Sequence, residues 1–248
     1  MTSVRKPESL PLTLALDGST EKLFLALLEG EACRAELSLD CARPHSETMM
    51  NAIRELLQLA GVELAMLQRL AVGYGPGSFS SLRISLATMQ GLSQALEIPL
   101  YGFVGLDLLA LPLTCQPLPI VALSDARRRQ VYWAQYETVD GRLMRTTPYR
   151  VDDPATVVTT LTKRRVLLAG GGAALYREEL ESLLPQAGFV GLPFVSVSPG
   201  MLRCLAWEDA PTVSYPTRDN SFPVVFRLSE SVSPLYIRPS DAELKQAG

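Results

Sequence analysis

One succession of strands, turns and a helix is written twice along this chain. The first copy contains three strand-like runs and a helical pattern, over residues 12–17, 22–29, 31–39 and 46–60. Apolar and polar residues alternate within 31–39, which is typical of a half-buried strand. Ser46 can cap the helix that follows, and Gly61 ends it.

The second copy begins at residue 119 and repeats the same order. Its strands are predicted over residues 119–125, 130–137 and 142–150. Asp140-Gly141 is a hairpin signal between the second and third of them. Asp152-Asp153-Pro154 then opens a helix, with Pro154 suited to its first turn.

Each copy continues with one more strand and one more helix. These are predicted over residues 69–75 and 79–96 in the first copy, and over 164–170 and 173–184 in the second. A duplicated βββαβα unit predicts an α/β protein of two facing lobes, the actin-like ATPase (ASKHA, ribonuclease H-like) superfold. We expect lobes at residues 1–105 and 106–212, and a C-terminal segment 213–248 that returns to the first lobe and carries a polar insertion at about 217–231.

The turns after the first strand of each copy are candidate nucleotide-binding elements. In this superfold such Asp-containing turns approach phosphate or its metal, and a Gly-rich turn passes close to the adenosine. The candidates are Asp17, Gly18, Ser19, Thr20, Asp125, Gly170, Gly171 and Gly172. Aspartate also favours turns through local hydrogen bonds, so plain structural turns remain the alternative.

Composition argues against several classes of protein. The net charge is −3, without the basic excess of an autonomous nucleic-acid binder, and the short basic runs 127–129 and 163–165 are interpreted as solvated surface. None of the four cysteines forms a C-x-x-C pair, which argues against a zinc knuckle and against a disulfide scaffold. The most apolar stretch, 100–123, contains Asp107 and three prolines, so we expect no membrane helix and a cytoplasmic protein.

The most specific stretch is the Gly/Pro-rich turn between residues 73 and 84. Glycines at 75 and 77 permit close backbone approaches, and Ser78 can cap the helix that follows or present free N–H groups to an anion. The motif residues are Gly75, Pro76, Gly77, Ser78, Phe79 and Arg83. A tight strand-to-helix turn without a ligand is the alternative.

This turn resembles the GPGSFTGLRIG motif of the TsaB (YeaZ) family. LALDGSTE near the start, SDARRRQVYWAQY in the second copy and SPLYIR near the end resemble the family's LAIDTSTE, DARRGEVYWA and P-x-YLR segments. The chain departs from these motifs at Gly18, which stands for threonine, and at Ser80-Ser81, which stand for Thr-Gly.

The resemblance implies a partner subunit in tRNA threonylcarbamoyladenosine (t6A) synthesis. Such a chain binds a TsaD-like catalytic subunit, with a TsaE-like ATPase as third partner, and pairs with itself when alone. It contacts tRNA only through the complex, with ATP or ADP as a candidate ligand at the complex interface. TsaD holds a metal with an H-x-x-x-H motif, but here the two positions are His45 and Met49, so we expect no metal, no tightly bound cofactor and no catalytic residue.

Two predicted helices carry wide apolar or small-residue faces, which suit a docking surface for the sister subunit. The candidate interface residues are His45, Met49, Met50, Ile53, Leu57, Ser81, Ser85, Thr88 and Ala95. Burial of these faces within the chain is the alternative. Two other functions stay open, an autonomous small-molecule kinase or ATPase that uses the Asp-containing turns, and a glycoprotease of the M22 type.

Overall fold

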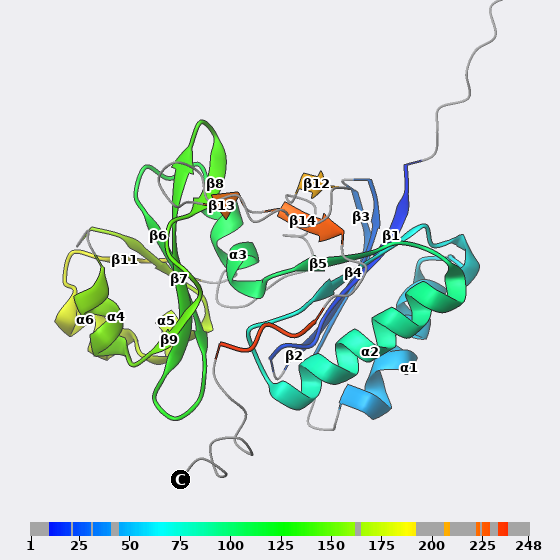
Figure 1. Cartoon of the computed structure of the whole chain (residues 1–248), viewed down its shortest axis with the longest axis horizontal. Helices are drawn as coiled ribbons and strands as arrows, with labels where there is room; N and C mark the ends of the chain where they lie inside the picture. Colours follow the sequence, from blue (N-terminus) through cyan, green and yellow to red (C-terminus); the bar gives the residue numbers. More distant parts are fainter. Residues whose placement is uncertain are drawn as a thin grey trace, which may run out of the picture.

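The computed structural model describes residues 10–20, 22–30, 32–40, 45–161, 165–191, 206–208, 222–223, 225–228 and 233–237. Within these residues two seven-stranded sheets form two lobes, with helices on their outer faces (Figure 1). This confirms the predicted α/β class and the actin-like duplication. No helix in the described ranges has both the length and the apolar composition needed to cross a membrane.

The first sheet has the strand order β12-β14-β5-β4-β1-β2-β3. Its strands are β1 (Leu12–Asp17), β2 (Lys22–Glu29), β3 (Ala32–Asp40), β4 (Arg69–Gly73), β5 (Leu100–Phe103), β12 (Ala206–Glu208) and β14 (Val225–Leu228). Strands β1 to β3 form an antiparallel meander, whereas β4 pairs parallel to β1 and β5 parallel to β4. The first three strands of the second sheet form the same antiparallel meander.

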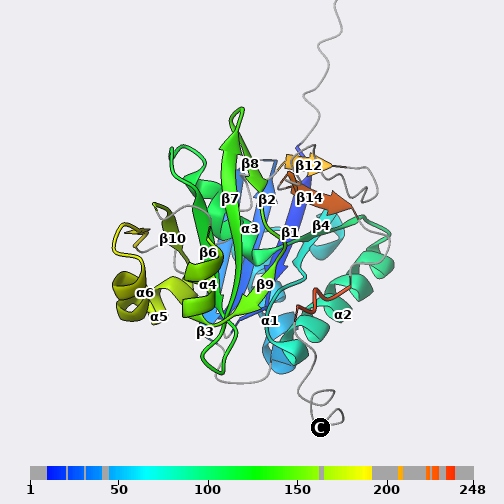
Figure 2. The same ribbon diagram turned by 60° about the vertical axis from the view of Figure 1, so that its left-hand side comes forward.

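Strands β1 and β2 are buried on both faces, because each face packs against a different core. Leu14, Leu16 and Leu25 face the outer core beneath the helices, while Ala15 and Ala26 face the core between the lobes. Helices α1 (His45–Leu59) and α2 (Phe79–Leu96) lie side by side on the outer face (Figures 1 and 2). The short helix η1 (Leu64–Met66) precedes β4. The bounds of α1 and α2 agree with the helices predicted over 46–60 and 79–96 to within one residue.

The second sheet has the order β11-β10-β6-β7-β8-β13, with β9 paired to β7. Its strands are β6 (Ile120–Asp125), β7 (Val131–Val139), β8 (Arg142–Arg145), β9 (Arg150–Asp152), β10 (Leu167–Ala169), β11 (Gly188–Phe189) and β13 (Phe222–Pro223). The single strand predicted over 142–150 is in fact two strands. The break has a local cause, because the Thr147 hydroxyl accepts from Gln135 N at 2.9 Å in place of a backbone carbonyl, and Pro148 has no N–H to donate.

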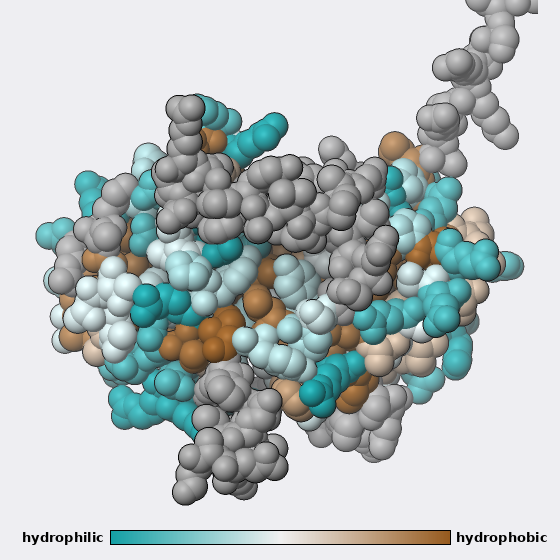
Figure 3. Space-filling model, in the orientation of Figure 1, coloured by the Kyte–Doolittle hydropathy of each residue, from teal (hydrophilic) through white to brown (hydrophobic). Residues whose placement is uncertain are grey.

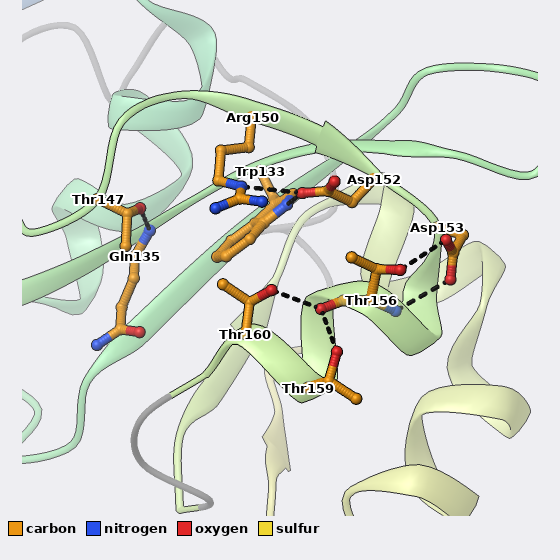
Figure 4. A network of polar contacts seen from close by, with 9 residues as sticks. All are labelled: Trp133, Gln135, Thr147, Arg150, Asp152, Asp153, Thr156, Thr159 and Thr160. Carbon is orange, nitrogen blue, oxygen red and sulfur yellow. Dashed lines mark hydrogen bonds and ion pairs between the residues drawn. The ribbon is translucent and has the colours of Figure 1, made fainter.

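The helices of the second lobe are shorter than those of the first. They are α4 (Pro154–Thr160), α5 (Gly171–Leu175) and α6 (Arg177–Leu183). The single helix predicted over 173–184 is wrong, because Tyr176 leaves the helical region with φ −106° and ψ 27°. The predicted start at Pro154 is confirmed, since Asp153 caps α4 by accepting from Thr156 N at 3.0 Å (Figure 4). These hydrogen bonds lower the pKa of the Asp153 carboxyl.

Asp152 fixes the strand that leads into this cap. Its Oδ2 accepts from the Trp133 indole N–H at 2.9 Å and from Arg150 Nε at 3.0 Å (Figure 4). Trp133 is fully buried, so its polar edge needs this partner. The two acidic residues predicted to open the helix thus have different roles. Asp152 accepts hydrogen bonds from side chains of the sheet, and Asp153 caps the helix.

The two lobes are joined by a continuous core rather than by a linker. Helix α3 (Gly105–Ala110) and the short helix η2 (Leu111–Leu113) follow β5, and α3 packs against β6. One apolar cluster includes Phe103 of the first lobe, Leu108 of α3, and Ala122 and Tyr136 of the second. The lobes therefore share buried surface along their facing sides.

The C-terminal part of the chain touches both sheets. β14 pairs with β5 of the first sheet and β12 pairs with β14, whereas β13 pairs with β8 of the second. Strand β12 lies in the first sheet, whereas the expected boundary at residue 212 falls outside the described residues and stays a prediction. The segment 217–231, expected as a polar insertion, contains β13 and β14.

Candidate functional site

The turn that follows β1 is buried and closed on itself. Asp17 is 3% exposed, and its Oδ1 accepts from Ser19 N at 2.9 Å. Gly73 at the end of β4 leaves room for this carboxylate, because a Cβ there would lie 2.6 Å from Asp17 Oδ1. Thr20 is half-buried, and its hydroxyl shares hydrogen bonds with the backbone of Lys22.

The Gly/Pro-rich loop covers this turn directly. Ser78 N donates to Ser19 O at 2.8 Å, and a Cβ at Gly77 would overlap the same carbonyl group. Gly75 has φ +119° and its carbonyl accepts from Gly105 N at 3.2 Å, so Gly75 also ties the loop to α3. The close approach that these glycines permit is to the chain's own backbone.

Ser78 occupies the N-cap position of α2, as predicted, but its side chain makes no capping bond. Its hydroxyl instead accepts from the Ser81 hydroxyl at 3.1 Å. The capping prediction is therefore wrong for the side chain, and right for the place where the helix begins.

Phe79 and Arg83 hold the C-terminal segment 233–237 onto α2. The Phe79 ring stacks on Tyr236 with centroids 5.1 Å apart, and Arg83 Nε donates to the Tyr236 hydroxyl at 3.0 Å. Leu235 N also donates to Tyr74 O at 2.8 Å. The sequence analysis identified the Gly/Pro-rich loop and the SPLYIR segment as motifs. It did not predict that Tyr236 of the second contacts the first, because the two are 153 residues apart in the sequence.

The turn after β6 repeats the geometry of the turn after β1. Asp125 Oδ1 accepts from Arg127 N at 2.9 Å, again from the backbone two residues on. This turn is more open than the first, since the Asp125 side chain is 32% exposed. The two Asp-containing turns are therefore equivalent in one respect, which is that each aspartate accepts a hydrogen bond from the backbone N–H two residues further on.

The glycines at 170–172 are packed against the strand that ends in Asp125. A Cβ at Gly170 would overlap Leu123 O, and one at Gly172 would lie 3.0 Å from Leu123 Cβ. Gly171 begins α5. These glycines bring a helix close to β6, and the space they leave is filled by the chain itself.

A buried carboxylate ties α3 to the second sheet. Asp107 is 8% exposed and accepts from the Tyr136 hydroxyl at 2.7 Å and the Tyr149 hydroxyl at 2.8 Å. Burial, followed by the nearby Asp107 charge, raises the pKa of both phenols well above the usual value. With the apolar cluster around it, this contact holds the facing sides of the two lobes together.

The predicted docking residues divide into two groups. Met49, Ile53, Leu57 and Ser85 are at most 5% exposed, so none of them projects from an open surface, although Ile53 and Leu57 line a groove along α1. The physical reason is that α1 and α2 need these side chains to cover their own sheet. Met50 and Ala95 are exposed and Ser81 and Thr88 are half-buried, while the side chain of His45 lies outside the described residues.

A groove of about 330 Å³ runs along α1. Met50, Arg54 and Gln58 form its exposed wall, Ile53 and Leu57 its floor, and Val62 and Leu64 its far side. Met50 is 42% exposed. Among the described residues, no group of three or more His, Cys, Asp or Glu side chains is placed to hold a metal ion.

Comparison with known proteins shows which family this chain resembles in sequence. Residues 39–192 match the family model "TsaD: tRNA N6-adenosine threonylcarbamoyltransferase". A protein of Bacillus subtilis named "tRNA threonylcarbamoyladenosine biosynthesis protein TsaB" is 31% identical over 180 residues, which are 72% of this chain and 79% of that protein. The chain belongs to the TsaB family.

Other proteins are similar to this chain over shorter or longer stretches. The Escherichia coli TsaB is 33% identical over 126 residues, 50% of this chain and only 54% of that protein, so the match spans about half of its length. The solved structure of YeaZ from Pseudomonas aeruginosa is 28% identical, with a TM-score of 0.64 over 79% of this chain and 90% of that one. A second Pseudomonas aeruginosa structure, described as similar to peptidase YeaZ, has a TM-score of 0.67 at 26% identity, over 92% of this chain and 100% of that one.

Proposed function

We propose that this chain is a non-catalytic subunit of the machinery that makes t6A in tRNA, and that it binds and stabilises a TsaD-type catalytic subunit. The names of the TsaB relatives support the pathway. The observation that carries the accessory role is the closure of the Asp17 turn and of both glycine loops by the chain's own backbone. A kinase or ATPase of this superfold needs that space for nucleotide.

Docking of the partner is proposed at the groove along α1. Its floor is apolar and its rim carries Met50, a side chain that adapts to irregular surfaces. A TsaE-type ATPase would be the third partner, and a second copy of this chain would occupy the groove when the partner is absent. Transfer of threonylcarbamoyl to adenosine would then take place on the partner, with tRNA bound by the whole assembly.

A matched pair of variants on one helix tests this proposal. Met50→Glu introduces a charge on the rim of the groove, and Leu59→Glu introduces the same charge on α1 outside the residues that line the groove. Both residues are exposed, at 42% and 75%, so both variants should fold. An unpaired charge buried on docking costs several kcal/mol, which lowers the affinity by about a hundredfold or more.

We expect Met50→Glu to abolish co-purification with the TsaD-type subunit and Leu59→Glu to leave it unchanged. Complementation of cells depleted of their own TsaB, with t6A measured by mass spectrometry of tRNA nucleosides, should follow the same order. Loss of pairing in both variants, or in neither, would move the docking surface away from this groove. ATP turnover by the pure chain that disappears in Asp17→Asn would favour the kinase alternative.

A further inference from the structure

Three consecutive arginines form the turn between β6 and β7 in an unusual backbone conformation. Arg127, Arg128 and Arg129 have φ of 61°, 53° and 59°. Residues with a Cβ visit this left-handed region as single residues, because the Cβ approaches the following carbonyl oxygen. A run of three therefore stores strain in one short turn.

The rest of the turn holds this conformation in place. Ala126 N donates to Gln130 O at 2.9 Å and Gln130 N donates to Arg127 O at 3.0 Å. The Asp125 carboxylate accepts from Arg127 N, and Arg129 lies 3.4 Å from Glu179 of α6. The geometry is thus fixed from both ends.

Position 129 is one of two at which this segment departs from the family motif, the other being Gln130 in place of glutamate. The DARRGEVYWA segment that it resembles has glycine there, and glycine adopts a positive φ without strain. This chain carries Arg129, with φ 59°, and a side chain that is 82% exposed. Strained residues cluster at functional sites where the surrounding structure holds them in place, so this guanidinium is a candidate for binding a ligand.

The chemistry of the turn indicates a polyanion. The side chains of Arg127 and Arg129 are 65% and 82% exposed, and Arg128 is exposed between them, in a chain whose net charge is −3. Arg127 lies 3.8 Å from Asp125, and Arg129 lies 3.4 Å from Glu179. Such exposed pairs contribute little and exchange readily for phosphate.

The turn also lies on the lobe away from the groove along α1. Figure 1 places it at the lower end of β7, in the second lobe, and Figure 3 shows hydrophilic residues along that edge. A partner docked on α1 would occupy the first lobe. The arginine turn would then stay open to a second, larger ligand.

We propose that the turn 126–130 binds the phosphate backbone of RNA in the assembly, which makes this chain a contributor to tRNA binding. The inference rests on the proposed function for the identity of the RNA. Guanidinium groups bind phosphate through paired N–H donors, and such contacts position an RNA without reading its sequence. This assigns a role to arginines that composition alone left as solvated surface.

The test uses the assembled complex of this chain with its TsaD-type subunit and an unmodified tRNA transcript. Arg128→Glu and Arg129→Gly change the turn, and Arg142→Glu, an exposed arginine near the opposite end of β7, is the matched control. We expect about tenfold weaker RNA binding for Arg128→Glu, with a salt dependence reduced by about 0.7–0.9 in the logarithmic slope for each lost phosphate contact. Arg142→Glu should leave both unchanged.

Arg129→Gly separates this function from a structural role. Glycine relieves the strain, so the melting temperature should rise, while the lost guanidinium should weaken RNA binding several-fold. A purely structural turn would show the rise alone, and unchanged RNA binding in both turn variants would overturn the proposal. If the wild-type complex does not assemble, the proposed function fails, and if it assembles but binds no tRNA, the RNA proposal fails. If Arg128→Glu prevents assembly with the protein partner, the turn is a protein-docking surface and the RNA proposal is wrong.

Discussion

The contact between Gly18 and Ser85 allows a test with Gly18→Ala. This substitution should lower the free energy of unfolding in the wild type and raise it in a Ser85→Ala variant. A Cβ on residue 18 would lie closer than 3.0 Å to Ser85 Oγ, and its next neighbours, Leu23 Cδ1 and Met49 Cε, would be 3.7 and 3.8 Å away. Those two distances are ordinary contacts. The Ser85 hydroxyl is therefore the obstacle, and it is also buried without a hydrogen-bond partner among the described residues.

The expected magnitudes follow from this geometry. Overpacking a dense core costs about 1–3 kcal/mol. Gly18 has no left-handed φ, so replacing it by alanine also restricts the unfolded chain and stabilises by about 0.4–1 kcal/mol. Gly18→Ala should thus destabilise the wild type by about 1.3 kcal/mol, the difference between the mid-range values of these two terms.

Removal of the obstacle should reverse the result. Ser85→Ala deletes a buried, unpaired hydroxyl and improves helix propensity, which should stabilise by about 1 kcal/mol. In that background Gly18→Ala should stabilise by about 0.4–1 kcal/mol, because the nearest remaining neighbours, Leu23 Cδ1 and Met49 Cε, lie at the ordinary contact distances of 3.7 and 3.8 Å. The coupling free energy of the cycle is then about 1–3 kcal/mol.

Urea unfolding of the four proteins measures the cycle, with equal m-values as the control for a common unfolded state. Equal destabilisation by Gly18→Ala in both backgrounds would refute the reasoning, because the Ser85 hydroxyl would then not be the group in the way.

Three further outcomes are expected from single residues. Asp153→Ala should destabilise by about 1 kcal/mol through loss of the α4 cap, and Asp153→Asn, which keeps an acceptor for Thr156 N, should cost less in the same urea assay. Gly77→Ala should lower the free energy of unfolding by more than about 2 kcal/mol and should not be rescued by Ser85→Ala, because its Cβ would meet a backbone carbonyl that cannot rotate away. Tyr136 keeps its proton in the fold and loses it on unfolding near pH 10, so its contribution is complete below that pH and is lost as the pH rises toward the raised pKa of the folded state. Stability should fall by about 1.4 kcal/mol per pH unit more in the wild type than in Tyr136→Phe above about pH 10, as measured by denaturant unfolding across pH 9–11.5.

Local patterns in the sequence predicted most of the elements, because their causes are local. The alternation in β3, the glycine after α1 and the Asp153-Pro154 start of α4 all act within one or two turns of chain. Failures occurred where a distant group intervened. The Thr147 hydroxyl replaced a ladder bond of β7 and divided a predicted strand, and no periodicity along 142–150 could have indicated it.

The candidate site shows the same division more sharply. The sequence identified Asp17, Gly77 and the glycines at 170–172 as special positions, since these residue types permit turns and close approaches. Their neighbours were not predictable, because Ser19 O and Leu123 O are brought to them by the folding of separate segments. The same limit applied to α1, whose apolar stripe suits either a partner or the chain's own sheet.

The sequence by itself determined the duplicated order of elements, the place of each Asp-containing turn and the family. Only the tertiary structure decided that the loops are closed by backbone, that Leu57 is core while Met50 is rim, and that three arginines share a strained turn. The physical reason is that periodicity fixes which face of an element is apolar, whereas what covers that face depends on contacts between residues far apart in the chain.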